Sequence, residues 1–276
     1  MKTHARAVVV GGGAVGCSIL YHLAKAGWTD VVLLERDELT SGSTWHAAGL
    51  LPLFNMSYAV SHIHNYSVNT YEQLEDETGL NAGLSRVGNL RMARTKERMD
   101  EYRLYASTAD TVGVDYEWIN GPDIEKRWPM INAEGLEGAI FHPGDGYINP
   151  ADLTMAYAKG ARQMGATIYR KKQVDAFNQK PNGEWVITGH DLETKEPFEM
   201  TAGKVITATG NHAQRTAAMI GCYIPAMPVE HQFVVTGECP TLAAYRAEGN
   251  AENPVIRDAD AKTYVREERG GWICGP

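Results

Sequence analysis

The amino-acid sequence predicts an α/β fold, α+β overall, in which a parallel-sheet domain is interleaved with an antiparallel-sheet domain. Residues 5–10 form a continuous apolar run, which is typical of a strand buried on both faces, and a glycine-rich loop follows at 11–16. A helical pattern and a second apolar run over 30–35 complete a βαβ opening. Near the other end of the chain, residues 227–237 and 262–275 alternate between apolar and polar side chains, as antiparallel strands do.

The first helix is predicted over residues 14–26. Val15, Ile19 and Leu23 recur there at helical spacing, and Gly27 supplies the stop. Periodicity predicts the next three elements as an amphipathic helix over 59–79, a strand over 88–94 and a helix over 95–111.

Residues 149–166 carry a strong helix signal. Asn149 suits the N-cap, Pro150 suits the first helical position and Gly165 ends the pattern. The following elements are expected as strands at about 166–172 and 184–189 with a turn at 180–183 between strands, and a buried strand over 204–210 that runs into a glycine.

These elements suggest two interleaved domains. We expect the first domain to comprise residues 1–85 and 145–222, and the second to comprise residues 86–144 and 223–276. The sequence stops directly after a predicted strand, without a capping element, so we expect it to be a fragment of a longer protein.

Composition narrows the class of protein. The chain has 276 residues, 43% of them hydrophobic, which is enough for a substantial core. A net charge of -8 argues against nucleic-acid binding, and no run of 18 apolar residues predicts a membrane span. Because the first strand begins by about residue 6, no targeting segment is expected. The four cysteines are scattered along the sequence, which indicates free thiols in a reducing compartment. We expect a cytoplasmic protein without a metal site.

The glycine loop indicates dinucleotide binding. Gly11, Gly13 and Gly16 match GxGxxG: the first allows a tight turn, the second lets a pyrophosphate approach and the third lets helix and strand pack closely. Glu35 ends the second strand, where a carboxylate accepts hydrogen bonds from a ribose. This favours NAD or FAD over NADP, although the adjacent Arg36 weakens the distinction, and the motif does not choose between NAD and FAD.

Residues 41–50, with the sequence SGSTWHAAGL, follow this unit. Gly42, Ser43 and Thr44 offer backbone N–H groups and hydroxyls to the second phosphate. The chain would then run beside the far end of the dinucleotide. A histidine at position 46 is there either a core residue, a hydrogen-bond partner or a nucleophile toward a flavin methyl group.

The stretch TSGSTWHAAGL, with the glycine loop before it and HPGDGYINPADLTMAYAKGARQMGA after it, closely resembles the dimethylglycine and sarcosine dehydrogenases. These are flavoproteins of the D-amino-acid-oxidase-like superfamily, and the likeness runs through essentially the whole chain. It implies a Rossmann-like FAD-binding domain, a substrate domain, and FAD attached covalently to His46 through the 8α-methyl group. It also implies that the backbone of Val174 contacts the adenine and that the strand end at Gly210 packs by the dinucleotide. The residues we expect to contact the cofactor are Gly11, Gly13, Ala14, Val15, Gly16, Glu35, Arg36, Gly42, Ser43, Thr44, Trp45, His46, Ala47, Ala48, Gly49, Leu50, Val174 and Gly210.

The resemblance also suggests residues for the chemistry. It places His231 and Tyr264 at the amine site, where histidine suits proton handling near pH 7. Arg266 is a possible partner for a substrate carboxylate, but we interpret it as an exposed strand arginine. His62 and His64 are two residues apart on a predicted helix, so they face different ways and are poor metal ligands.

The sequence thus predicts FAD-dependent oxidative demethylation of an N-methylated glycine, dimethylglycine or sarcosine. The electron acceptor would be an electron-transfer flavoprotein or O2, and tetrahydrofolate would be a partner only in a longer native chain. One alternative is a flavin oxidase of another secondary amine such as 4-methylaminobutanoate. Another is an inactive truncated chain that binds at most the ADP half of FAD, since relatives close the flavin site with a later segment. A nicotinamide dehydrogenase is disfavoured by the histidine motif.

Overall fold

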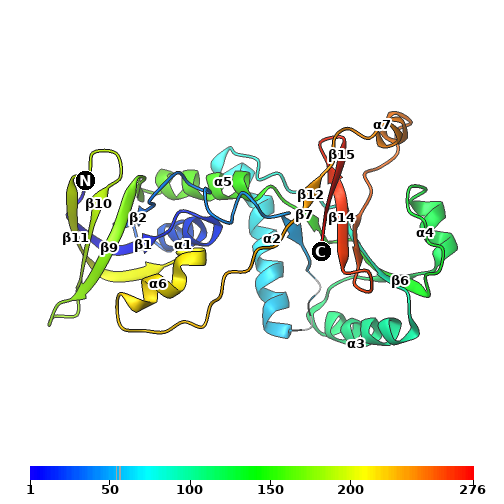
Figure 1. The fold of residues 1–276 in the computed structure, drawn as a ribbon, viewed down its shortest axis with the longest axis horizontal. Coiled ribbons are helices and arrows are strands. Elements are labelled where there is room, and N and C mark those ends of the chain that lie inside the picture. The colour runs from blue at the N-terminus through cyan, green and yellow to red at the C-terminus, as the bar shows by residue number, and fades with distance from the viewer. Residues whose placement is uncertain (54, 56) are drawn as a thin grey trace. The chain divides into compact units, whose positions relative to one another are not determined.

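The computed structural model describes residues 1–53, 55 and 57–276 (Figure 1). The chain divides into two compact units, each assembled from separate stretches of sequence. Unit 1 comprises Met1–Ala47, Tyr71–Gly83 and Asn149–Val229. Unit 2 comprises Ala48–Thr70, Leu84–Ile148 and Glu230–Pro276. The combination of parallel and antiparallel sheets confirms the predicted α/β, α+β class.

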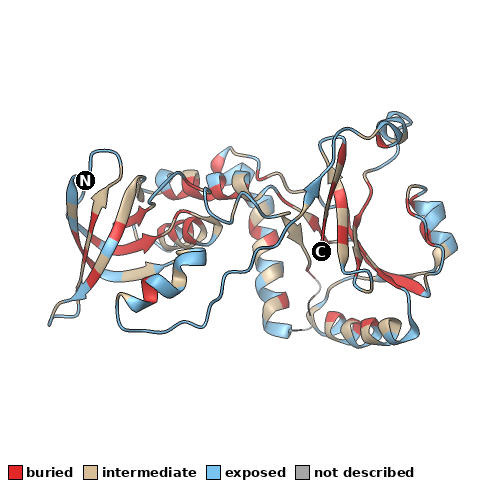
Figure 2. Cartoon of the chain, in the orientation of Figure 1, coloured by how far each residue is buried: buried red, intermediate tan, exposed pale blue. Residues whose placement is uncertain are grey.

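Unit 1 is built on a six-stranded sheet in the order β8-β2-β1-β11-β10-β9. The strands β1, β2, β8 and β11 pair in parallel, whereas β9 and β10 extend the sheet in antiparallel pairing. The strands are β1 (His4–Val10), β2 (Val31–Leu34), β8 (Thr167–Tyr169), β9 (Lys172–Gln179), β10 (Trp185–Asp191) and β11 (Pro197–Thr207). The parallel core agrees with the predicted βαβ opening, in which β1 and β2 are almost wholly buried (Figure 2).

The helices of unit 1 begin where the sequence signals stand. Helix α1 (Ala14–Lys25) starts after Gly13, and α5 (Pro150–Gln163) is capped by Asn149, whose side chain accepts the N–H groups of Ala151 and Asp152. The remaining segments are the end of α2 (Tyr58–Thr78), the 3-10 turn η1 (Gly210–His212) and α6 (Ala213–Ala218).

The buried stripe of α1 differs from the predicted one. Val15 is 66% exposed, and Ile19 and Leu23 are only partly buried. The helix instead buries the neighbouring stripe of Gly16, Cys17, Leu20, Tyr21 and Ala24. The reason is the close packing of α1 against α5, where a Cβ at Gly160 would lie 2.9 Å from the Tyr21 ring.

Unit 2 contains a seven-stranded sheet in the order β12-β15-β14-β13-β4-β6-β5 and a two-stranded sheet of β3 and β7. Only β13 and β4 pair in parallel; the other neighbours in the large sheet are antiparallel. Its strands are β3 (Leu50–Leu51), β4 (Asn89–Ala93), β5 (Glu117–Ile119), β6 (Gly138–His142), β7 (Gly146–Tyr147), β12 (Val234–Val235), β13 (Val255–Asp258), β14 (Thr263–Glu268) and β15 (Gly271–Gly275). The helices are most of α2, α3 (Lys96–Val112), α4 (Gly121–Arg127) and α7 (Pro240–Ala247).

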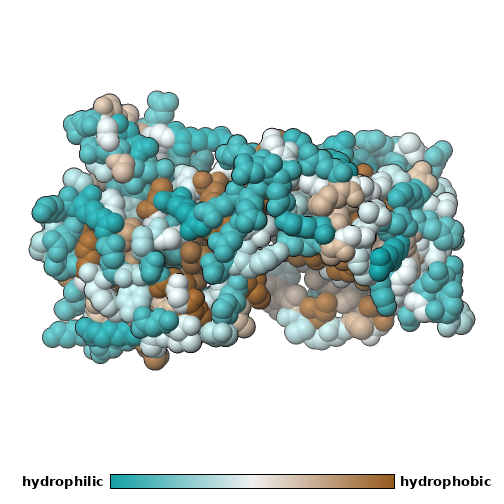
Figure 3. Space-filling model, turned by 180° about the vertical axis from the view of Figure 1, so that it is seen from behind, coloured by the Kyte–Doolittle hydropathy of each residue, from teal (hydrophilic) through white to brown (hydrophobic). Residues whose placement is uncertain are grey.

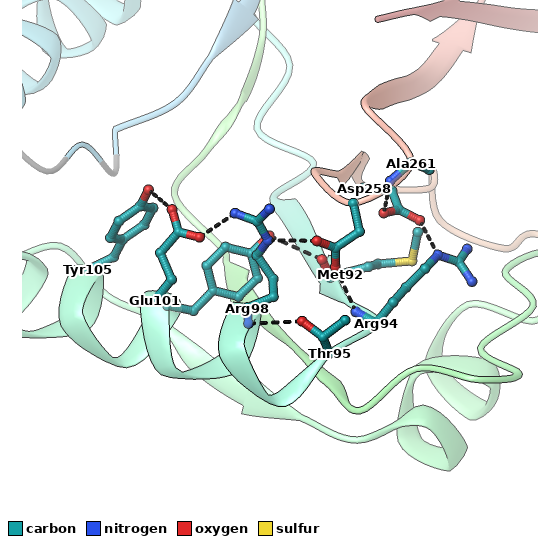
Figure 4. A network of polar contacts seen from close by, with 10 residues as sticks. Met92, Arg94, Thr95, Arg98, Glu101, Tyr105, Asp258 and Ala261 are labelled. Carbon is teal, nitrogen blue, oxygen red and sulfur yellow. Dashed lines mark hydrogen bonds and ion pairs between the residues drawn. The ribbon is translucent and has the colours of Figure 1, made fainter.

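Charged side chains connect the start of α3 to the turn after β13 (Figure 4). Arg94 Nε donates to Asp258 at 2.8 Å, and Arg98 Nε donates to Asp260 at 2.9 Å. Asp258 is 2% exposed and also accepts the N–H of Ala261 at 2.9 Å. The network therefore binds β4 and β13, which are adjacent in the sheet but more than 150 residues apart.

One predicted strand near the carboxyl end needs correction. Residues 227–237 do not form one strand: only Val234–Val235 does, as the edge strand β12. Met227 and Val229 are 86% and 81% exposed, so burial of apolar side chains does not stabilise a strand here. Pro228 also lacks the backbone N–H that a strand would donate. Residues 262–275 form the hairpin β14–β15, because Arg269 and Gly270 adopt positive φ and turn the chain.

The face of the molecule shown in Figure 3 is mainly polar. Hydrophilic residues cover most of the face seen in Figure 3, and hydrophobic residues reach it in separate patches. Among the described residues, no helix is both long enough and apolar enough to cross a membrane.

Candidate functional site

A cavity of about 430 Å³ lies in unit 1, at the edge of the sheet where the parallel strands β1, β2 and β11 end. This is the edge where ligands bind in open α/β sheets. Many of the predicted cofactor residues line it, namely Gly11, Gly13, Ala14, Val15, Glu35, Arg36, Gly42, Ser43, Thr44, Val174 and Gly210.

The glycine loop has no room for side chains. Gly11 has a φ of +113°, and a Cβ on it would lie 2.3 Å from the carbonyl oxygen of Ala208. A Cβ on Gly16 would lie 1.9 Å from the carbonyl oxygen of Gly11, and one on Gly13 would lie 2.9 Å from Thr44 Oγ1. The loop backbone therefore borders the cavity without a side-chain cover, as a pyrophosphate site requires.

The start of α1 lies at this loop. Gly13 is its N-cap and lines the cavity together with Ala14 and Val15, so the positive end of the helix dipole lies at the cavity. Thr44 had been expected at the second phosphate; its Oγ1 accepts the N–H of Ala14 at 3.1 Å. Thr44 thus connects the 41–50 stretch to the helix start.

Glu35 directly follows β2 and is held by backbone groups. Its Oε2 accepts the N–H of Gly12 at 2.6 Å, and its Oε1 accepts the N–H of Asp37 at 2.7 Å. Each carboxylate oxygen can accept more than one hydrogen bond, so the group retains capacity for ribose hydroxyls. The arrangement fixes the acid at the rim of the cavity.

Trp45, His46 and Ala47 are exposed and are not among the cavity-lining residues. The His46 Nδ1 lies 3.1 Å from the carbonyl oxygen of Gly42, and the Trp45 and His46 ring centroids are 3.9 Å apart. Since a carbonyl only accepts, Nδ1 carries the proton of the neutral ring and Nε2 carries the lone pair.

The rest of that stretch belongs to unit 2. Ala48 accepts a hydrogen bond from Arg266 Nε at 3.0 Å, and Gly49 accepts the N–H of Ile148 at 2.8 Å. Leu50 forms part of the strand β3. The predicted residue Gly16 is buried in α1 and acts in packing.

Both predicted amine-site residues lie in unit 2, by the end of β15. His231 is exposed, and its Nε2 lies 3.0 Å from the main-chain oxygen of Pro276. Tyr264 is 7% exposed and pairs with Gly275, whose ideal Cβ would be 2.5 Å from Tyr264 Oη. Burial raises the pKa of Tyr264, while the neighbouring Arg266 lowers it, so the phenol is neutral at pH 7. The structure therefore brings these two residues to one end of the β14–β15 hairpin.

The expectation for Arg266 is wrong. Its side chain is 6% exposed, because β14 is an interior strand of the sheet. The guanidinium lies 4.3 Å from the ring centroid of Tyr147, and Nη1 forms an ion pair with Glu268 at 2.8 Å. These contacts make Arg266 a buried structural cation.

Several cavity residues were not found from the sequence. They come from β9 and from the segment after β11, and include Lys172, Phe177, His212, Arg215 and Met219. Lys172 is paired with Asp191, and this contact, with the N–H groups of Thr194 and Glu193, lowers the pKa of Asp191 to about 2. No local signal marks these residues, because the fold alone brings β9 and α6 to the glycine loop.

Comparisons with known proteins give the family. A family model described as FAD dependent oxidoreductase matches residues 6–276. The chain belongs to this FAD dependent oxidoreductase family. The mitochondrial dimethylglycine dehydrogenase of Rattus norvegicus is 40% identical over 275 residues, which cover all of this chain and 31% of that protein. The predicted resemblance is confirmed.

Two further comparisons agree with the family. The 4-methylaminobutanoate oxidase (formaldehyde-forming) of Paenarthrobacter nicotinovorans is 35% identical over 275 residues, covering all of this chain and 32% of that protein. The crystal structure of L-proline dehydrogenase from P. horikoshii superposes with a TM-score of 0.85 at 24% identity, over all of this chain and 70% of that one. The likeness to L-proline dehydrogenase, at 24% identity, shows a shared fold only. The chain spans about a third of the length of the curated relatives it matches.

The cavity fits the dinucleotide part of FAD. Three glycines keep the loop clear for a pyrophosphate, and Glu35 lies where a ribose would reach it. The apolar residues Val174, Phe177 and Met219 line the same cavity and suit an aromatic base. Unit 1 therefore has features that fit a pyrophosphate, a ribose and an aromatic base.

Proposed function

We propose that this chain is the FAD-binding part of a flavoenzyme that oxidatively demethylates an N-methylated glycine, dimethylglycine or sarcosine. The single observation that carries the proposal is the cavity of unit 1, where the glycine loop and Glu35 meet in a member of the FAD dependent oxidoreductase family. In this proposal unit 1 binds the cofactor, and unit 2 contributes to the substrate site.

FAD supplies the redox chemistry when bound, by accepting a hydride equivalent from the carbon next to the amine nitrogen. The protein's own residues bind the cofactor and orient it. The glycine loop and the start of α1 hold the pyrophosphate, Glu35 accepts the ribose hydroxyls, and Val174 contacts the adenine.

We assign His46 as the covalent attachment site. The hydrogen bond from Nδ1 to Gly42 leaves Nε2 as the basic nitrogen of the ring, and the side chain is exposed. Both features suit attack on the 8α-methyl group of the flavin. The family resemblance of the stretch 41–50 supports the same assignment.

His231 and Tyr264 are proposed to act on the substrate amine. Histidine can accept a proton from an ammonium near pH 7, which leaves the neutral amine that hydride transfer needs. Tyr264 keeps its proton at this pH because burial raises its pKa, so its hydroxyl can orient the amine as a donor.

The electron acceptor is proposed to be an electron-transfer flavoprotein or O2. The likeness to 4-methylaminobutanoate oxidase supports a second candidate, an oxidase of another secondary amine. Oxygen consumption with each amine, in the absence of an added acceptor, distinguishes the two. A tetrahydrofolate partner would act only in a longer native chain.

The test is covalent flavin on the purified chain. After acid precipitation and denaturing electrophoresis, the wild-type band should fluoresce under ultraviolet light. His46→Ala should be dark, and His62→Ala, which changes an exposed histidine elsewhere, should fluoresce. A dark wild-type band with FAD still bound reversibly would refute the covalent assignment, and a chain that binds no FAD would indicate the inactive-fragment alternative.

A further inference from the structure

The cavity wall includes a cation on the β11 side of the glycine loop. Strand β1, which leads into that loop, lies between β2 and β11. Arg36 follows β2 and lines the cavity from one side. Arg215, on α6, follows β11 and lines it from the other side. The glycine loop is therefore flanked by two arginines.

The other charges of the lining are largely compensated. Lys172 is paired with Asp191, and Asp37 is paired with Lys171. Glu35 is held by two backbone N–H groups. Among the residues that the structure describes, no ion pair is found for Arg36, nor for Arg215 on the other side of the loop. The positive charge of Arg215 is thus available to an anion in the cavity.

Arg215 stands on a segment that is anchored to the loop. The absent Cβ of Gly11 would lie 2.3 Å from the carbonyl oxygen of Ala208, so the loop touches the turn that leads to α6. Within that segment, Thr216 Oγ1 donates to the His212 carbonyl at 2.9 Å and lies 2.9 Å from Thr209 Oγ1. These contacts fix α6 beside the glycine loop.

We propose that Arg215 binds the pyrophosphate of the dinucleotide, opposite the start of α1. This inference rests on the proposed function, in which FAD occupies the cavity. A pyrophosphate carries two negative charges, whereas the start of a helix contributes about half a positive charge. A guanidinium adds a full charge and a planar pair of donors that match phosphate oxygens.

The experiment measures the dissociation constants of ADP, adenosine and FAD by calorimetry and flavin fluorescence. Arg215→Ala should weaken the binding of ADP and FAD about tenfold, which is the range for a charge-assisted contact, and leave adenosine unchanged. Arg215→Lys should recover part of the loss. Arg170→Ala is the matched control, because Arg170 is an exposed arginine of unit 1 that pairs with Glu38 and does not line the cavity.

The outcomes separate this inference from the proposed function. If Arg215→Ala binds ADP and FAD as the wild type does, the role of Arg215 is wrong and the FAD site stands. The role is also wrong if adenosine binding falls as much as ADP binding, because the effect would then not depend on phosphate. A wild-type chain that binds neither ADP nor FAD would overturn both.

Discussion

Glu35 at the end of β2 and Gly12 in the glycine loop are joined by a hydrogen bond of 2.6 Å from the Gly12 N–H to Glu35 Oε2. The bond connects the loops that follow two neighbouring strands of the sheet, β1 and β2, at the cavity. One carboxylate thus shapes the loop and remains beside the space that a ribose would fill.

Glu35→Gln should weaken FAD binding about tenfold. The amide has one accepting oxygen, so either the Gly12 or the Asp37 N–H loses its acceptor, and the charged acceptor for ribose hydroxyls is lost. The measurement is FAD titration by flavin fluorescence. Glu38→Gln is the control, because Glu38 is exposed and pairs with Arg170. An unchanged dissociation constant in Glu35→Gln would exclude Glu35 from cofactor binding.

Gly16→Ala should abolish FAD binding and lower the free energy of unfolding by about 2 kcal/mol or more. The new Cβ would lie 1.9 Å from the Gly11 carbonyl oxygen, so the loop must move. Gly27→Ala is the control: its φ is +84° but no atom lies within 4 Å, so it should cost about 1 kcal/mol and spare FAD binding. Urea denaturation and FAD titration give both quantities. Equal effects of the two changes would contradict the steric argument.

Arg266→Ala should lower the urea midpoint of the protein, with a loss of about 2 kcal/mol in the free energy of unfolding. The change removes the hydrogen bond to Ala48 and the stacking on Tyr147, and leaves Glu268 without its buried partner. Arg269→Ala, whose side chain is 89% exposed, should cost less than about 0.5 kcal/mol. The two changes should differ in their loss of unfolding free energy because Arg266 is buried and Arg269 is exposed. Midpoints that agree within error would show that the buried contacts add no stability.

His142 should make the stability of the protein depend on pH. Burial, assisted by the positive charge of Arg91, lowers the pKa of His142 from 6.5 to about 3. Between these values the unfolded chain binds the proton and the folded protein does not. Its contribution is therefore complete above about pH 6.5 and is lost as the pH falls toward 3.

Urea midpoints measured from pH 7 to pH 4 test this dependence. The slope against pH should be shallower in His142→Gln than in wild type. Identical slopes for the two proteins would show that His142 has the same pKa in the folded and unfolded states.

The sequence predicted the elements whose signals are local. The strand β1, the glycine loop, α1, β2 and Glu35 are consecutive, and their spacing is fixed by one βαβ unit. The start of α5 could also be predicted from the sequence, because the Asn149 side chain accepts the first N–H groups of the helix that it precedes. These features depend on neighbours within a few residues.

Other elements depended on partners distant in the sequence. The strand β13 lies between β4 and β14 and was not predicted, because its short run gains its burial from strands that the chain reaches elsewhere. Residues 227–237 had the alternation of a strand but lacked a face to bury, so only β12 formed. Arg266 looked like a surface residue, and its interior strand buried it.

The sequence by itself determined the family, the nucleotide-binding half of the cavity and the candidate residues His46, His231 and Tyr264, whose roles stay predictions. Only the tertiary structure decided the other wall of the cavity, where β9 and α6 bring Lys172, Phe177 and Arg215 to the glycine loop. The physical reason is that hydrogen bonding within a turn or cap is set by adjacent residues. Burial and charge pairing are set by whichever segments the sheet order makes neighbours.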